Sequence, residues 1–128
     1  MSDDDFLAAL ESCRLPPEQF GHREHVRAAF LYLERLSFGA AIDRMRTTLQ
    51  RYTTHLGSSS KYHETVTVAF MSLVNAHRQA GGYGDWSEFE ALNPELFDAT
   101  LLGRYYAPET LASARARQSF VLERLKGT

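Results

Sequence analysis

Histidine is the residue type whose positions in this sequence first suggest chemistry. His22 and His25 are three residues apart, so in a helix they share one face. His63 is followed directly by Glu64. Imidazole and carboxylate side chains are the ligands that zinc, iron and nickel take in proteins, and they are also common general bases. These four residues would form a site if the fold brought them together.

Three predicted helices would position these residues. Apolar residues recur at spacings of three and four over about 21–36, 40–55 and 61–79, which is the pattern of amphipathic helices. Short connections favour antiparallel neighbours, so we expect the outer two helices to run parallel, with the middle one running back between them. The histidines at the starts of the outer helices would then converge at one end of the bundle.

The same topology bears on the other two histidines. His55 falls in the last turn of the middle helix, at the same end, and the pattern leaves open whether it joins the site. His77 lies 14 residues after His63 in the sequence. At 1.5 Å per residue that separation is about 21 Å along the helix axis, which excludes His77.

The rest of the chain is also predicted to be helical. We expect a first helix from Asp3 to Leu15, short helices after the glycine-rich stretch 81–84, and a last helix from Pro108 to about Leu125. No repeat or long linker divides the chain. We therefore predict an all-α fold, a single helical domain over 1–128, arranged as an irregular bundle with the very apolar 61–79 helix at its centre.

Composition excludes several classes of protein. Of the 128 residues, 44% are hydrophobic and 23% are charged, which is typical of a globular domain and not of a disordered chain. A formal charge of −2 argues against a nucleic-acid partner or an anionic membrane surface. No segment approaches the ~18 apolar residues of a membrane span, and the acidic N-terminus is unlike a signal peptide. The single cysteine, Cys13, favours a reducing compartment, so we expect a cytoplasmic protein.

Three segments resemble a known family. They are Phe-Gly-His-Arg-Glu-His at 20–25, Tyr-His-Glu-Thr at 62–65, and the stretch from Tyr105-Tyr106 to Leu-Ala-Ser-Ala-Arg at 111–115. They are similar to segments of a family of small, uncharacterised all-helical bacterial proteins that carry F-x-H-x-x-H and Y-H-E-T motifs. The resemblance covers about residues 16–120 and implies a bacterial cytosolic origin, but no reaction. It adds Tyr62, Thr65 and Arg115 as candidate ligand-binding residues.

The leading interpretation is a small cytosolic protein with a His/Glu-lined pocket for a small-molecule substrate or ligand. In its metal-dependent version His22, His25 and His63 bind a divalent zinc, iron or nickel ion, and Glu64 is a fourth ligand or a general base. In its metal-free version a histidine is the general base, Glu64 orients it, and Arg115 holds an anionic substrate.

The alternative is a helical interaction module or homodimer without catalytic activity. The apolar surplus of the 61–79 helix, together with Tyr105 and Tyr106, would then be buried against a partner. The histidines would only complete helix ends, and Glu64 would favour the positive end of its helix dipole.

Overall fold

The computed structural model describes residues 1–124, and helices are its only regular secondary structure in that range. This confirms the predicted all-α class. The α-helices are α1 (Asp3–Glu11), α2 (His22–Arg35), α3 (Phe38–His55), α4 (Glu64–Ala80), α5 (Trp86–Leu92), α6 (Pro108–Ala112) and α7 (Ala114–Gln118). Short 3-10 helices join them: η1 (Pro17–Gln19), η2 (Ser59–Lys61), η3 (Pro94–Phe97) and η4 (Leu101–Arg104).

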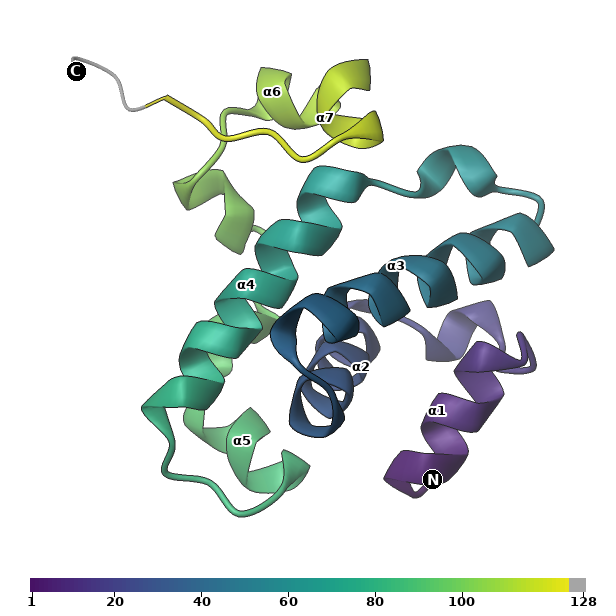
Figure 1. Ribbon diagram of the computed structural model, residues 1–128, viewed down its shortest axis with the longest axis vertical. Coiled ribbons are helices and arrows are strands. Elements are labelled where there is room, and N and C mark those ends of the chain that lie inside the picture. Colours follow the sequence, from purple (N-terminus) through teal and green to yellow (C-terminus); the bar gives the residue numbers. More distant parts are fainter. Residues whose placement is uncertain (125–128) are drawn as a thin grey trace.

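Helix α2 is the most extensively buried element. Its buried side chains are Val26, Ala28, Ala29, Phe30, Leu31, Tyr32 and Leu33. They belong to the hydrophobic core, so the stripe of apolar residues seen in the sequence is buried. Helix α2 contacts α3, α4, α5 and η3, and it lies between α1 on one side and α4 and α5 on the other (Figure 1). Fully burying a side chain such as Val26, Phe30 or Leu33 contributes roughly 1.5–3 kcal/mol.

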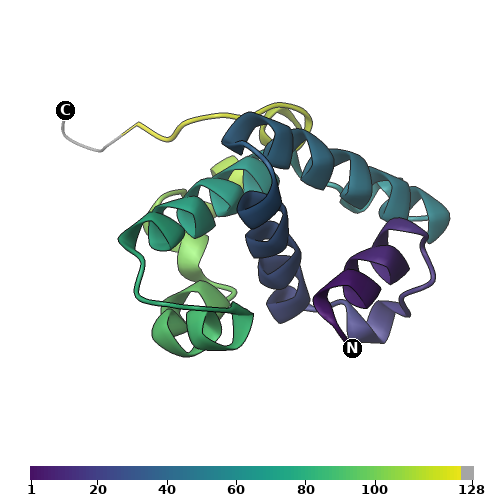
Figure 2. The same ribbon diagram turned by 60° about the horizontal axis from the view of Figure 1, so that its bottom comes forward.

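Helix α4 packs against α2, α3, α7 and η4. Figure 2 shows α2 passing beneath the end where α3 and α4 come together, with α1 on the far side of the molecule from α4. Only part of the apolar surface of α4 is buried, since Val68, Phe70 and Leu73 are half-buried.

The helices α2 and α4 cross at an angle (Figure 2). At their ends, Glu34 accepts a hydrogen bond from Nε of Arg78 at 2.8 Å. At the start of α2, the ring of His22 meets Phe70, with centroids 5.0 Å apart. Phe70 lies seven residues after His63, or about 10 Å along the axis. The start of α4 therefore lies about two turns away from the point where α4 meets the start of α2.

Both ends of the chain differ from the prediction. Helix α1 ends at Glu11, because Cys13 adopts a positive φ of 62° and the chain reverses before it reaches Leu15. The helix predicted to begin at Pro108 is broken at Ser113, whose extended backbone ends α6 and whose hydroxyl caps α7. After Gln118 the described chain is not helical, and Leu125 lies outside the described residues.

No helix within residues 1–124 is both long enough and apolar enough to cross a membrane.

Candidate functional site

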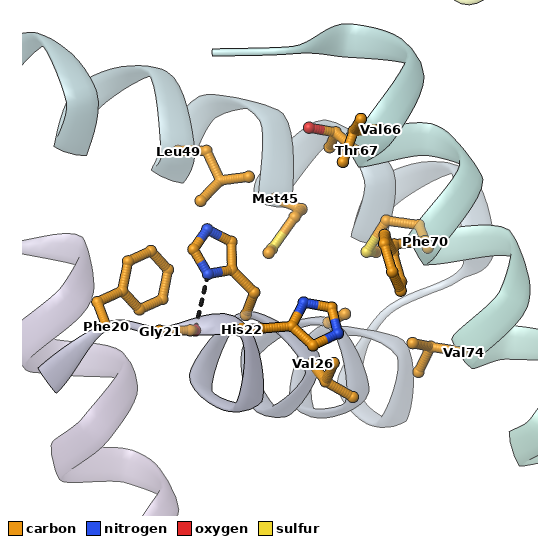
Figure 3. Close-up of a pocket in the computed structure, with 13 residues that line it drawn as sticks. Phe20, Gly21, His22, Val26, Met45, Leu49, Val66, Thr67, Phe70 and Val74 are labelled. Atoms are coloured by element: carbon orange, nitrogen blue, oxygen red, sulfur yellow. Dashed lines mark hydrogen bonds between the residues drawn. The ribbon is translucent and has the colours of Figure 1, made fainter. Parts of the chain in front are cut away.

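A largely apolar pocket of about 370 Å³ lies between α2, α3 and α4. Its walls are Phe20, Gly21, His22, His25, Val26, Ala29, Met45, Leu49, Val66, Thr67, Phe70, Met71 and Val74 (Figure 3). The part of the chain that is described contributes no Arg, Lys, Asp or Glu to this lining. The two imidazoles are therefore its main polar groups, and a fully charged ligand would find no counter-charge there.

The ring of His25 is fixed by a hydrogen bond and by stacking. Its Nδ1 lies 2.9 Å from the carbonyl oxygen of Gly21, and its ring stacks on Phe20 with centroids 4.0 Å apart. A carbonyl can only accept, so Nδ1 carries the proton and Nε2 of the neutral ring presents a lone pair. Burial lowers the pKa of His25 below its ordinary value of 6.5, which keeps the ring neutral near pH 7.

His22 is fixed through the opposite ring nitrogen. Its Nε2 lies 2.9 Å from the carbonyl oxygen of Leu96 in η3, so Nε2 is the donor and Nδ1 of a neutral ring is the acceptor. Figure 3 shows this ring above Val26 and facing Phe70. Two adjacent imidazoles therefore reach the pocket with their tautomers fixed by backbone carbonyls.

The free nitrogens of these rings are open to a ligand. Neither Nδ1 of His22 nor Nε2 of His25 has a hydrogen-bond partner among residues 1–124. Neither is sealed inside the protein, because the fully buried side-chain nitrogens without a partner in that range are Nε of Arg27 and Nε1 of Trp86.

His63 is not part of this pocket. Its Nδ1 accepts a hydrogen bond from the backbone N–H of Val66 at 3.1 Å and so caps α4. Its Nε2 donates to the carbonyl oxygen of Leu111 at 2.7 Å, so both ring nitrogens are used. His63 lies apart from the pocket histidines because the start of α2 meets α4 at Phe70, about two turns after His63.

The metal site expected from His22, His25 and His63 is therefore not found. Residues 1–124 contain no group of three or more His, Cys, Asp or Glu side chains that could hold a metal ion. The donor set needed for the predicted zinc, iron or nickel ion is thus incomplete at the pocket, where two imidazoles stand alone.

Glu64 is paired with an arginine and with no histidine. Nε of Arg46 donates to its two oxygens at 2.9 and 3.1 Å, and Nη2 of Arg46 donates at 2.7 Å. The Tyr62 hydroxyl donates a further bond at 2.6 Å. The hydrogen bond from Arg46 lowers the pKa of Glu64, while burial and Glu64 raise the pKa of Tyr62 to about 12. Glu64 is an ionised link between α3 and α4, and the expected contact with a histidine is absent.

Thr65 ties the C-terminal segment to α4. Its hydroxyl is buried, donates to the carbonyl oxygen of Ser119 at 2.9 Å and accepts from the N–H of Val121 at 3.1 Å. The Tyr-His-Glu-Thr segment thus connects α4 to three other parts of the structure: α3, α6 and residues 119–121.

Arg115 and His55 lie outside the pocket. Arg115 is exposed and borders a separate shallow depression with Glu109 and Thr110. His55 is exposed at the end of α3. Apart from His22 and His25, the lining of the pocket was not predicted from the sequence, and neither were the contacts that Phe20 and the Leu96 carbonyl make with these two rings. Phe20 is the first residue of the F-x-H-x-x-H motif, whereas no sequence signal marks Leu96.

Comparison with known proteins gives no relative. No protein-family model matches this chain, and no curated protein or solved structure matches it either. The resemblance to small bacterial helical proteins therefore stays a prediction.

Proposed function

We propose that this protein binds a small, mostly apolar molecule in the pocket between α2, α3 and α4, through an O–H or N–H group of that molecule. One observation carries the proposal. His22 and His25 each commit one ring nitrogen to a backbone carbonyl and direct an unpartnered nitrogen toward a cavity of about 370 Å³. Apolar cavities with a few well-placed polar groups are the usual form of small-molecule sites.

The chemistry that the pocket supports is hydrogen-bond acceptance by His25. A neutral imidazole whose protonated Nδ1 is held by the Gly21 carbonyl presents a lone pair at Nε2, which can accept a hydrogen bond from a ligand. The ligand would be a neutral molecule with an O–H or N–H donor, since the apolar lining disfavours an ion.

A pair of matched probes tests the proposal. 2-Naphthol carries an O–H donor, whereas 2-methoxynaphthalene has nearly the same shape without it. We expect 2-naphthol to bind about tenfold or more tightly, which corresponds to one hydrogen bond worth about 1.4 kcal/mol. His25→Phe retains a ring against Phe20 and should abolish this preference. Equal affinity of the two probes for the parent protein would contradict the proposal.

A pocket-filling variant shows whether the probe occupies this cavity. Val66 lines the pocket and is half-buried, whereas Val68, on the same helix, is half-buried without lining it. Val66→Phe should prevent binding of 2-naphthol, and Val68→Phe should leave it unchanged. Binding that survives in Val66→Phe would place the probe elsewhere.

A second candidate function, self-association, is favoured by a separate observation. Tyr105, Phe120 and Leu122 are 52%, 42% and 80% exposed, and all three border a groove that also includes Leu73 of α4. Sedimentation velocity tests this candidate: a dimer that dissociates in Leu122→Ser would support it, and a monomer at all concentrations would remove it.

A further inference from the structure

A second, polar cleft of about 790 Å³ lies on another side of α3. Met45 and Leu49 face the apolar pocket, and the residue after each of them, Arg46 and Gln50, faces the cleft. Hydroxyl and amide side chains make up much of the remaining lining, including Ser59, Ser60 and Gln118. The two cavities therefore have opposite chemistry, and a ligand of the cleft would be independent of any ligand of the apolar pocket.

Arg117 is the group in the cleft whose charge is not balanced. Its Nη1 donates to the carbonyl oxygen of Ser60 at 3.0 Å and lies 3.4 and 3.5 Å from those of Lys61 and Tyr62. These contacts anchor the guanidinium against η2. Its Nε and Nη2 have no partner among residues 1–124, and no carboxylate in that range pairs with it. The N–H groups of Nε and Nη2, which lie along one edge of the guanidinium, are therefore available to a ligand.

Two other arginines of this protein bind carboxylates through their Nε and Nη2 groups. Arg46 binds Glu64 in this way, and Arg23 binds Glu90. Two parallel N–H groups match the spacing of two oxygens in a carboxylate or phosphate. Glu64 cannot serve Arg117 in this way, because Arg46 and Tyr62 already hold both of its oxygens. The free edge of Arg117 suits an oxoanion supplied from outside the chain.

We propose that this cleft binds the phosphate or carboxylate group of a small polar molecule, with the Nε and Nη2 groups of Arg117 as the bidentate anchor. The hydroxyls of Ser59 and Ser60 supply further donors, and the cleft has room for a polar body beyond the anionic group. Arg46 remains committed to Glu64 and contributes a polar wall.

The test is titration of the full chain with inorganic phosphate and, separately, with sodium acetate, followed by isothermal calorimetry and backbone amide NMR at low ionic strength. We expect one or both anions to shift amides of residues 58–62 and 117–118. Binding of phosphate alone identifies a phosphate site, and binding of acetate identifies a carboxylate site. If neither anion shifts these amides, the proposal is overturned.

Variants separate the cleft from a generally basic surface. Arg117→Gln should weaken binding about tenfold or more, and Arg117→Lys should weaken it too because lysine lacks the paired N–H edge. Arg115→Gln, two residues away and exposed, is the matched control and should bind like the parent. Equal losses in Arg115→Gln and Arg117→Gln would overturn the proposal.

One further variant leaves Arg117 and its carbonyl contacts intact. Gln50→Glu has the same shape, lies on the exposed surface of α3 and adds a negative charge inside the cleft. It should abolish anion binding while its thermal stability stays near that of the parent. Unchanged binding in a folded Gln50→Glu would contradict the assignment, even if Arg117→Gln fails to fold.

Discussion

The Nδ1 atom of His25 lies 2.9 Å from the carbonyl oxygen of Gly21, one turn earlier along the chain. That carbonyl also accepts the backbone N–H of His25, at 3.1 Å. One oxygen thus fixes the start of α2, the orientation of the imidazole and the position of its proton. Because Nδ1 must donate, the nitrogen left for chemistry is Nε2, in a pocket whose described lining holds His22 but no Arg, Lys, Asp or Glu.

The lowered pKa of His25 predicts a pH-dependent loss of stability. Burial lowers the pKa of this group in the folded protein below the ordinary 6.5, so the unfolded chain binds the proton more readily. The free energy of unfolding should be unaffected by this group above about pH 6.5 and should fall as the pH decreases below it. In His25→Phe this part of the decrease should disappear. Urea unfolding at pH 7.5 and pH 5.5 measures this loss of unfolding free energy. An equal loss in the parent and in His25→Phe would contradict the prediction.

Replacing Glu64 should cost stability and leave the apolar pocket functional. Glu64→Gln removes a partly buried carboxylate that receives bonds from Arg46 and Tyr62, so we expect a loss of about 1–3 kcal/mol in unfolding free energy. Asp43→Asn is the matched control, because Asp43 pairs with the same arginine but is 79% exposed, and should cost less than about 0.5 kcal/mol.

Glu64 also contributes to the free energy of unfolding in a pH-dependent way, but at lower pH than His25. The hydrogen bond from Arg46 lowers the pKa of Glu64 in the folded protein, so its stabilisation is complete above its ordinary value of 4.5 and is lost as the pH falls through the folded-state pKa. Glu64→Gln should remove this acid-sensitive part. Loss of 2-naphthol binding in a folded Glu64→Gln would instead favour the catalytic role predicted from the sequence.

His63 should act as a helix cap that an amide can partly replace. His63→Ala removes the acceptor for the Val66 N–H and the donor to the Leu111 carbonyl, and should cost about 0.5–2 kcal/mol. His63→Asn keeps a capping acceptor and should recover part of that loss. Thermal unfolding compares the three proteins. Equal stability of His63→Ala and the parent would exclude the capping role.

Thr65 should hold the segment at 119–121 in place. In Thr65→Val the hydroxyl is lost while the volume is nearly kept, so the Val121 amide loses its acceptor. Hydrogen exchange at Val121 should accelerate markedly, while amides in the middle of α4 keep their protection. Thr65→Ser retains the hydroxyl and should restore slow exchange. Unchanged exchange at Val121 in Thr65→Val would show that other contacts hold this segment.

Helix positions could be predicted from the sequence, but the points at which the helices contact one another could not. The spacing of apolar residues predicts helices at about 21–36 and 40–55, and the structure has them at His22–Arg35 and Phe38–His55. That spacing determines which face of a helix is buried. It does not determine where along its length one helix meets another, and α2 meets α4 about two turns after His63, which separates His63 from His25.

The motif at 62–65 shows a second limit of prediction from sequence. Successive residues at a helix start point about 100° apart, so neighbours in sequence reach different elements. Tyr62 and Glu64 face the polar cleft beside α3, whereas His63 reaches α6 and Thr65 reaches residues 119–121. The histidines at the start of α2 could be predicted as pocket residues because they continue its apolar stripe. The partners of the Tyr-His-Glu-Thr residues depend on long-range packing that no local pattern contains.

Whether Nε2 of His25 receives a ligand proton donor can be read from the ring ¹⁵N chemical shifts of His25, measured by long-range ¹H–¹⁵N correlation at pH 7. We predict a protonated Nδ1 and an unprotonated Nε2, with the Nε2 resonance moving on addition of 2-naphthol and staying fixed on addition of 2-methoxynaphthalene. A His25 ring protonated at Nε2, or an Nε2 resonance that ignores 2-naphthol, would contradict the function proposed for this pocket.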